Sequence, residues 1–187
     1  MDTMLDYEIN KEMAESYLFI GDFDKAESYY EKAAKANANG ADAYMGLATI
    51  AVQRGQINKA MKLYKKAVEI KPSDKALCGM GLVYMEQGRH DKAMDHFQRA
   101  LRLAPGNMVA LNCLVREAYS MGRVAAALPY LEAALETGVE QEAVSVTLAG
   151  CLICLGKGAQ ARRHLEAVLR INPSNEDARD LIQTMAA

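Results

Sequence analysis

The stretch Leu77–Pro105, LCGMGLVYMEQGRHDKAMDHFQRALRLAP, contains the pattern that decides the fold. Apolar residues stand three or four positions apart on both sides of a central glycine, and a proline closes the stretch. This spacing places apolar side chains on one face of a helix, so two helices separated by a turn are predicted. In order, the marked positions are Leu77, Met80, Gly81, Tyr84, Gly88, Ala93, Phe97, Ala100 and Pro105.

The same pattern recurs along the chain at intervals of 33 or 34 residues. The glycines are Gly21, Gly55, Gly88, Gly122 and Gly156. The alanines five positions later are Ala26, Ala60, Ala93, Ala127 and Ala161. The large apolar residues that follow are Tyr30, Tyr64, Phe97, Leu131 and Leu165, and the small ones after them are Ala33, Ala67, Ala100, Ala134 and Val168. A fixed period of this length indicates stacked structural repeats.

Each part of the repeat has a physical role. The glycine suits the end of the first helix, because a residue without a Cβ adopts the left-handed conformation of the turn at the lowest energetic cost. The alanine allows close approach on the inward face of the second helix, and the larger residue continues that face. Proline closes three repeats, at Pro72, Pro105 and Pro173, because it cannot continue a helix. We therefore expect one antiparallel helix pair per repeat.

The motif Leu77-x-x-Met80-Gly81-x-x-Tyr84, with Ala93, Phe97 and Pro105, resembles the tetratricopeptide repeat (TPR). The resemblance implies an all-α fold, a right-handed α-solenoid of antiparallel helix pairs. We expect one domain over residues 1–187, with repeats at about 7–40, 41–73, 74–107, 108–141 and 142–175. The segment 175–185 is expected to be a capping helix, with Ala178, Leu181 and Ile182 on its apolar face.

Three repeats depart from the pattern. The first lacks the closing proline, and the fifth has Leu152 where tyrosine is common. In the fourth, Val139 occupies the proline position and Pro129 falls inside the second helix, so a kink or a shifted helix start is predicted there.

Composition and charge make several classes of protein function less favoured. The net charge of −2 gives no electrostatic reason to expect a nucleic-acid partner. The first six residues lack the features of a signal peptide, and no stretch is long and apolar enough to insert into a membrane. The four cysteines do not form the pattern of a secreted disulfide scaffold. We expect a cytoplasmic protein without cofactors.

The resemblance implies that partner peptides lie in a concave groove lined by the first helix of each pair. The candidate peptide-binding residues are Lys11, Glu15, Phe19, Met45, Thr49, Val52, Cys78, Leu82, Met85, Asn112, Arg116 and Tyr119. Further groove positions are Glu8, Val146, Gly150 and Ile153.

The chemistry of these positions favours an apolar or amphipathic ligand. The Lys/Asn/Arg set with which some family members hold a C-terminal carboxylate is missing, since Glu15, Gly46 and Gly79 stand at matching positions beside Lys11 and Lys75. Methionine surfaces adapt to varied apolar partners. A protein-interaction module of adaptor, scaffold or chaperone-like type is the leading interpretation. The alternative for Met45, Val52, Leu82 and Met85 is packing between neighbouring first helices. Cys78 and Cys113, on adjacent first helices, are interpreted as packing or groove-lining thiols.

Catalytic and metal-binding patterns are weak. Cys151-x-x-Cys154 lies within a helix rather than at its N-terminus and lacks further ligands at zinc-site spacing. His90, His96 and His164 have no nucleophile or carboxylate at a catalytic spacing. We therefore expect neither an enzyme nor a metal site.

Self-association is the second functional hypothesis. Residues 1–31 contain nine acids against Lys11 and Lys25, whereas Arg162, Arg163 and His164 make the last repeat basic. Opposite charges at the two ends favour a head-to-tail, open assembly.

Overall fold

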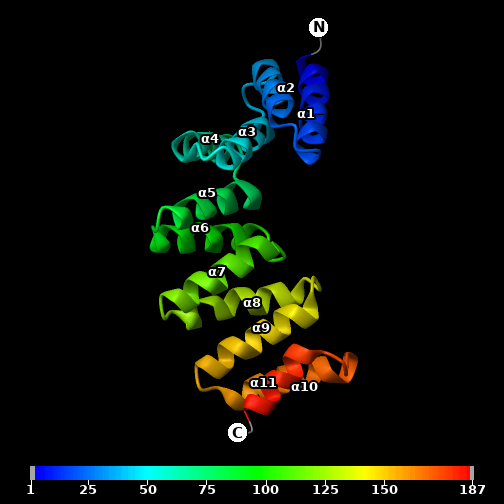
Figure 1. The fold of residues 1–187 in the computed structure, drawn as a ribbon, viewed down its shortest axis with the longest axis vertical. Helices are drawn as coiled ribbons and strands as arrows, with labels where there is room; N and C mark the ends of the chain where they lie inside the picture. Colours follow the sequence, from blue (N-terminus) through cyan, green and yellow to red (C-terminus); the bar gives the residue numbers. More distant parts are fainter. Residues whose placement is uncertain (1–2, 186–187) are drawn as a thin grey trace. The chain divides into compact units, whose positions relative to one another are not determined.

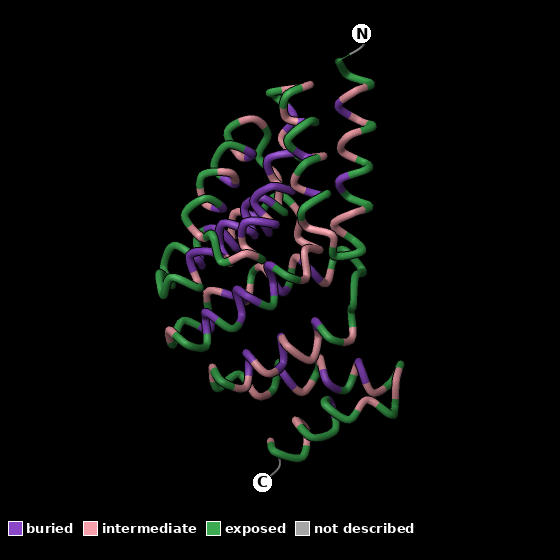
Figure 2. The backbone as a smooth tube through the Cα atoms, turned by 45° about the horizontal axis from the view of Figure 1, so that its top comes forward, coloured by how far each residue is buried: buried purple, intermediate pink, exposed green. Residues whose placement is uncertain are grey.

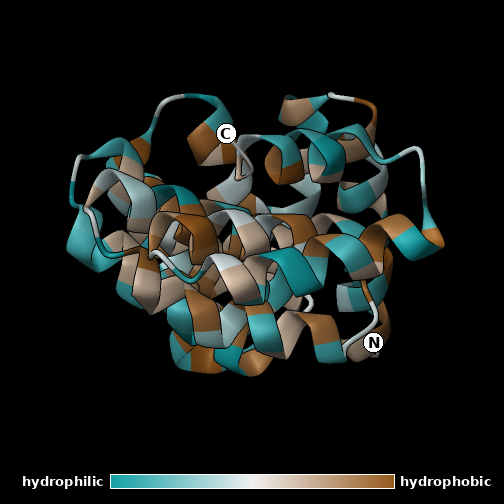
Figure 3. Cartoon of the chain, turned by 90° about the horizontal axis from the view of Figure 1, so that it is seen from below, coloured by the Kyte–Doolittle hydropathy of each residue, from teal (hydrophilic) through white to brown (hydrophobic). Residues whose placement is uncertain are grey.

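The computed structural model describes residues 3–185, in which eleven α-helices and one short 3₁₀ helix follow one another and no strand occurs (Figure 1). The all-α class predicted from the sequence is confirmed. The helices gather in two compact units, Met1–Ala100 and Leu101–Ala187. Around the helices, apolar and polar residues alternate (Figure 3), as expected where one face packs and another meets solvent.

The first unit contains three helix pairs. The first pair is α1 (Thr3–Phe19) and α2 (Phe23–Ala36), the second is α3 (Ala41–Gln53) and α4 (Ile57–Ile70), and the third is α5 (Asp74–Glu86) with most of α6 (His90–Leu103). Helix α1 starts four residues before the expected repeat boundary at residue 7. A three-residue turn joins the two helices of each pair, so their chain directions are opposed.

The repeat glycines end the first helices in a left-handed conformation. Gly55 has φ 69°, and its N–H donates to Val52 O at 2.8 Å while the next N–H, of Gln56, donates to Ala51 O at 2.8 Å. These bonds satisfy carbonyl groups that the helix end would leave unpaired. The glycine register in the sequence therefore marks the turn inside each pair.

Successive pairs pack through aromatic rings on glycines. The Tyr30 ring of α2 lies on Gly46 of α3, and the Tyr64 ring of α4 lies on Gly79 of α5, so closely that a Cβ at either glycine would overlap the ring. Alanines such as Ala33, which is fully buried, bring the backbones together around these rings. Figure 2 shows the result as buried segments along the inward faces of the helices.

An ion-pair network adds a polar link between the first two pairs. Arg54, directly after α3, donates to Glu27 and Asp24 of α2. Lys59 of α4 donates to the second oxygen of Glu27 at 2.8 Å. Both cations lower the pKa of Glu27, and the hydrogen bond from Lys59 is the largest cause.

The second unit contains α7 (Met108–Ser120), a 3₁₀ helix η1 (Val124–Ala127), α8 (Leu128–Glu136), α9 (Gln141–Cys154), α10 (Gly158–Ile171) and α11 (Glu176–Thr184). Pro129 lies at the start of α8, after the 3₁₀ turn. The shifted helix start predicted from Pro129 is thus present. Proline has no N–H to donate to the preceding turn, which explains why the α-helix begins late.

Helix α11 occupies the stretch where a capping helix is expected. Asn175 caps its N-terminus by accepting from the Ala178 N–H at 2.9 Å. Ala178 is fully buried, Leu181 and Ile182 are half-buried, and the helix packs on α10 and α9. Its exposed face carries Glu176, Asp177, Arg179 and Asp180.

Candidate functional site

In the first unit the predicted groove residues lie on neighbouring first helices, since α1 contacts α3 and α3 contacts α5. The side chains on α3 and α5 are half-buried, neither enclosed nor fully exposed. Thr49 holds its place by donating to Met45 O at 3.1 Å and by a 3.3 Å hydrogen bond with the Tyr64 hydroxyl. The half-buried members are Met45, Thr49, Val52, Leu82 and Met85.

Cys78 differs from its predicted role as a groove-lining residue. Its side chain is buried, with 5% exposure, and the residues around it on α5 from Ala76 to Gly81 are buried as well. Glycines at positions 79 and 81 let neighbouring rings approach this part of α5 closely, which encloses the thiol. Cys78 therefore belongs to the packed interior rather than to an accessible face.

The predicted residues on α1 have varied surroundings. Lys11 is half-buried, donates to Glu8 and lies 5.8 Å from the centroid of the Tyr7 ring. Glu15 is exposed. Phe19, the last residue of α1, is 92% exposed, which is unusual for a large aromatic side chain.

In the second unit, Asn112, Arg116 and Tyr119 are exposed on α7. Tyr119 reaches α9, where its hydroxyl hydrogen-bonds Cys151 and lies near Gly150. Burial, followed by this hydrogen bond, raises the pKa of Tyr119. The structure thus brings two predicted groove positions, Tyr119 and Gly150, together.

Three of the four cysteines have packed, buried thiols. Cys78, Cys113 and Cys151 are buried and Cys154 is exposed, all as free cysteines. Burial raises the pKa of the Cys113 and Cys151 thiols, which disfavours the reactive thiolate. Among residues 3–185, no group of three His, Cys, Asp or Glu side chains is placed to hold a metal ion.

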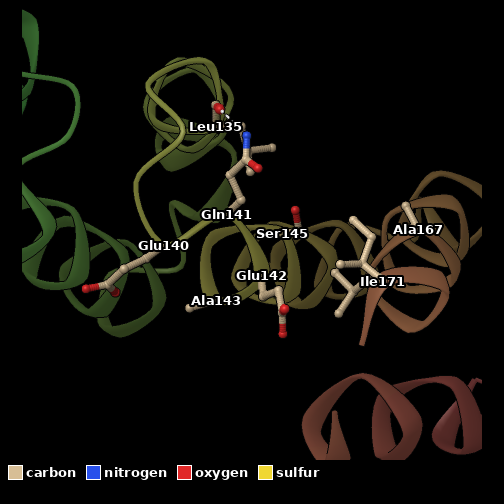
Figure 4. A pocket seen from close by; sticks show the side chains of 9 residues that line it. Leu135, Glu140, Gln141, Glu142, Ala143, Ser145, Ala167 and Ile171 are labelled. Carbon is tan, nitrogen blue, oxygen red and sulfur yellow. Dashed lines mark hydrogen bonds between the residues drawn. The ribbon is translucent and has the colours of Figure 1, made fainter. Parts of the chain in front are cut away.

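A pocket of about 640 Å³ lies in the second unit beside the start of α9 (Figure 4). Its apolar walls come from Leu135 of α8 and from Ala167, Val168 and Ile171 of α10. Glu140 and Glu142 add acidic groups. Glu142 already accepts from the side-chain amides of Asn172 and Asn175, at 2.8 and 3.3 Å. Its carboxylate therefore stabilises the local fold.

A second pocket, of about 400 Å³, lies in the first unit between α4 and the turn after α5, and it is basic. Tyr84 is 8% exposed, and the Arg89 guanidinium stands 5.0 Å from the centroid of its ring. Lys62, Lys65 and Lys66 indicate a charged helix face in the sequence. The sequence does not indicate that Arg89 lies beside this face. The lining residues are Asn58, Met61, Lys62, Lys65, Tyr84, Gln87 and Arg89.

Sequence reasoning also missed an outward apolar stripe on α1. The buried residues of α1 are Tyr7 and Ala14, and most of the helix beside the N mark in Figure 2 is half-buried or exposed. More than half of the exposed large apolar side chains in the described part of the chain lie on α1 or directly after it. They are Met4, Leu5, Ile9, Met13, Phe19 and Ile20. No helix within residues 3–185 is long and apolar enough to cross a membrane.

Three tetratricopeptide repeat models match the chain, at residues 11–75, 75–107 and 118–184. The chain therefore belongs to the tetratricopeptide repeat family. A curated relative, the BBSome complex member BBS4 of Bos taurus, is 33% identical over 72 residues. That match covers 38% of this chain and 14% of the relative, so the chain spans a small part of the relative's length.

Solved structures show the same fold. The pilF protein of Pseudomonas aeruginosa matches with a TM-score of 0.72 and 19% identity, covering 97% of this chain and 90% of that one. YrrB, described as a TPR protein with an unusual peptide-binding site, matches with a TM-score of 0.66 and 18% identity, covering 93% and 90%. MamA from Desulfovibrio magneticus RS-1 matches with a TM-score of 0.64 and 14% identity, covering 91% and 97%. These likenesses confirm the predicted TPR solenoid class.

Proposed function

We propose that this protein is an interaction module that binds an apolar or amphipathic segment of a partner protein on the first-helix face of its first unit. The chain belongs to a family of protein-interaction modules. The observation that carries the proposal is the row of half-buried apolar side chains on the neighbouring helices α3 and α5: Met45, Val52, Leu82 and Met85.

Half-burial distinguishes these residues from the core. The inward residues of the same helices, such as Ala48 and Val83, are 0% and 1% exposed. A side chain that keeps part of its surface in solvent gains further free energy when a partner covers that remainder. Methionine adds adaptability, because its unbranched, polarisable side chain fits irregular apolar partners. An amphipathic helix or an extended apolar segment matches this face.

The test compares binding by the wild type, Leu82→Asp and Leu103→Asp, each checked for native helicity by circular dichroism. Leu82 lies on the proposed face, whereas Leu103, at the end of α6, is 54% exposed and lies outside it. Both changes place the same charge at a leucine with accessible surface. Partners captured from native lysate are identified, purified and titrated against all three proteins.

We expect a purified partner to bind the wild type and Leu103→Asp equally and to lose about tenfold or more in affinity for Leu82→Asp, since a charge in an apolar contact is costly. Equal affinity for all three folded proteins would move binding off this face. An unfolded Leu82→Asp variant would instead indicate that Leu82 packs in the core, because burying an unpaired charge costs several kcal/mol.

A further inference from the structure

We propose that the outward face of α1 in one copy of the protein docks on the basic α4 surface of a second copy, giving open head-to-side assembly. The α1 stripe and the α4 pocket contain none of the α3 and α5 residues proposed to bind partners, while Glu15, at the border of the stripe, is also a predicted groove residue. This pairing refines the self-association hypothesis, which placed the basic partner surface on the last repeat.

The donor surface is the side of α1 turned away from the core. Leu5, Ile9 and Met13 recur at intervals of four, on the helix side opposite the buried Tyr7 and Ala14. Their exposed fractions are 58%, 50% and 37%. An amphipathic helix of a soluble protein normally presents polar residues on this side, so the stripe marks a surface to be covered.

Acidic residues border that stripe. Glu12 and Glu15 are exposed on α1, and neither forms an ion pair within residues 3–185, whereas Glu8 is paired with Lys11. Two unpaired carboxylates beside an apolar row repel an identical surface. Face-to-face pairing of two α1 helices is therefore disfavoured, and a basic partner surface is favoured.

The acceptor surface is the basic pocket between α4 and the turn after α5. Helix α4 carries four lysines and one glutamate, Glu69. Lys59 is bound to Glu27, but Lys62 and Lys65 are exposed and form no ion pair in the described part of the chain. These two ammonium groups and Arg89 surround a pocket with Met61 and Tyr84 in its walls.

The two surfaces match in kind. Each combines apolar groups with two charges of one sign that form no ion pair within residues 3–185, Glu12 and Glu15 on one surface and Lys62 and Lys65 on the other. Contact between the α1 stripe and the side chains of Met61 and Tyr84 in the pocket walls removes apolar surface from water. Glu12 and Glu15 then lie opposite Lys62 and Lys65. Long lysine stems also cover apolar surface while their charged ends remain hydrated.

The last repeat is a weaker acceptor. Arg162 and His164 of α10 are half-buried and Arg163 is exposed, but the helix that packs on α10 is acidic. Helix α11 exposes three acids and one arginine, and the pocket beside α10 contains Glu140 and Glu142. These carboxylates would repel the acidic edge of α1.

The donor and acceptor are different surfaces, so the contact is heterologous and leaves one of each free after every addition. Sedimentation velocity of the full chain at rising protein concentration tests this property. We expect the wild-type mass to grow beyond a dimer at low ionic strength and to fall at high ionic strength, because salt screens exposed charges. A monomer at every concentration and low ionic strength would overturn the proposal.

Charge-reversed variants identify the surfaces. Glu12→Lys/Glu15→Lys and Lys62→Glu/Lys65→Glu should each associate about tenfold or more weakly than the wild type, since like charges then face each other. Mixed together, they should assemble in alternation, because the acidic donor of Lys62→Glu/Lys65→Glu faces the basic acceptor of the other variant, and the basic donor of Glu12→Lys/Glu15→Lys faces the acidic acceptor. Failure of the mixture to associate would contradict the pairing.

Apolar variants provide the remaining control. Ile9→Asp should abolish association, whereas Ile171→Asp, at a residue 79% exposed on α10, should leave it unchanged. Native circular dichroism of both variants excludes unfolding as the cause. If Ile9→Asp associates as strongly as the wild type, α1 is not part of the interface. If Lys62→Glu/Lys65→Glu does so, α4 is not part of it. Either result overturns the proposal.

Discussion

The Tyr64 ring of α4 lies directly on Gly79 of α5, so that a Cβ at Gly79 would stand 2.6 Å from Tyr64 Cε1. Tyr64 is 6% exposed and its hydroxyl is hydrogen-bonded to Thr49 Oγ1, so the ring has little room to move. Gly46 has the same relation to Tyr30 one repeat earlier. Glycine at these helical positions thus sets the distance between successive pairs.

We expect Gly79→Ala to lower the free energy of unfolding by about 1–2 kcal/mol, because the overlap with Tyr64 outweighs the better helix propensity of alanine. Chemical denaturation measures this change. Gly150→Ala is the matched control: a Cβ there meets the Tyr119 hydroxyl at 3.7 Å, so the same substitution should stabilise by up to about 1 kcal/mol. In a Tyr64→Leu background the cost of Gly79→Ala should shrink; an unchanged cost would show that another contact causes it.

The Glu27 network predicts a pH dependence of stability. The hydrogen bonds from Lys59 and then Arg54 lower the pKa of Glu27 in the folded state, below the value of about 4.3 for an unfolded chain. Ionised Glu27 therefore favours folding. This contribution is complete above the unfolded pKa and is lost as pH falls through the folded pKa.

Thermal unfolding should show that Glu27→Gln destabilises the protein by about 1 kcal/mol at neutral pH, since the carboxylate is partly exposed. The difference between wild type and variant should disappear at acid pH below the folded pKa. High salt at neutral pH should also reduce it. A difference that is constant across the acid range would mean that the charge of Glu27 is not the cause.

Cysteine accessibility gives a direct test of the packing of α5 and α9. Cys154 is exposed, whereas Cys78, Cys113 and Cys151 are buried, the latter two with pKa values raised by burial. We expect one thiol of the native protein to react rapidly with a thiol reagent and all four to react after denaturation. Mass spectrometry locates the label, and rapid modification of Cys78 in native protein would contradict its burial.

The sequence predicts the pairing of helices because the glycine register and the i, i+4 spacing act locally. Gly88 marks a turn and Pro129 a delayed helix start without knowledge of any neighbour. Burial of Cys78 and convergence of Arg89 with Lys62 are different. They depend on how one repeat sits against another, and the repeat period alone does not specify which side chains meet there.

The candidate peptide-binding face was accessible to sequence reasoning only in part, for a related reason. An apolar residue on a first helix can serve packing, binding or both, and Leu82 and Val83 show how adjacent positions differ: the first is half-buried and the second is 1% exposed. Position on the helix wheel predicts which side faces the core. The fraction of a side chain that stays exposed to a partner depends on the size of its neighbours. Glycines, for example, let α4 approach α5 closely.

Pro129 supplies the last prediction, because it determines where α8 begins. The other second helices contain 14 residues, and α8 contains 9, preceded by the 3₁₀ turn Val124–Ala127. That turn is rich in alanine, the best helix former, so its sequence alone does not oppose an α-helix. We expect Pro129→Ala to extend α8 toward Val124, since the new N–H can donate to the carbonyl of Ala125. Hydrogen exchange should then reveal a protected amide at position 129 and slower exchange in the turn. An unprotected amide there would show that packing of Val124 and Ala127, 4% and 0% exposed, holds the 3₁₀ turn without the proline.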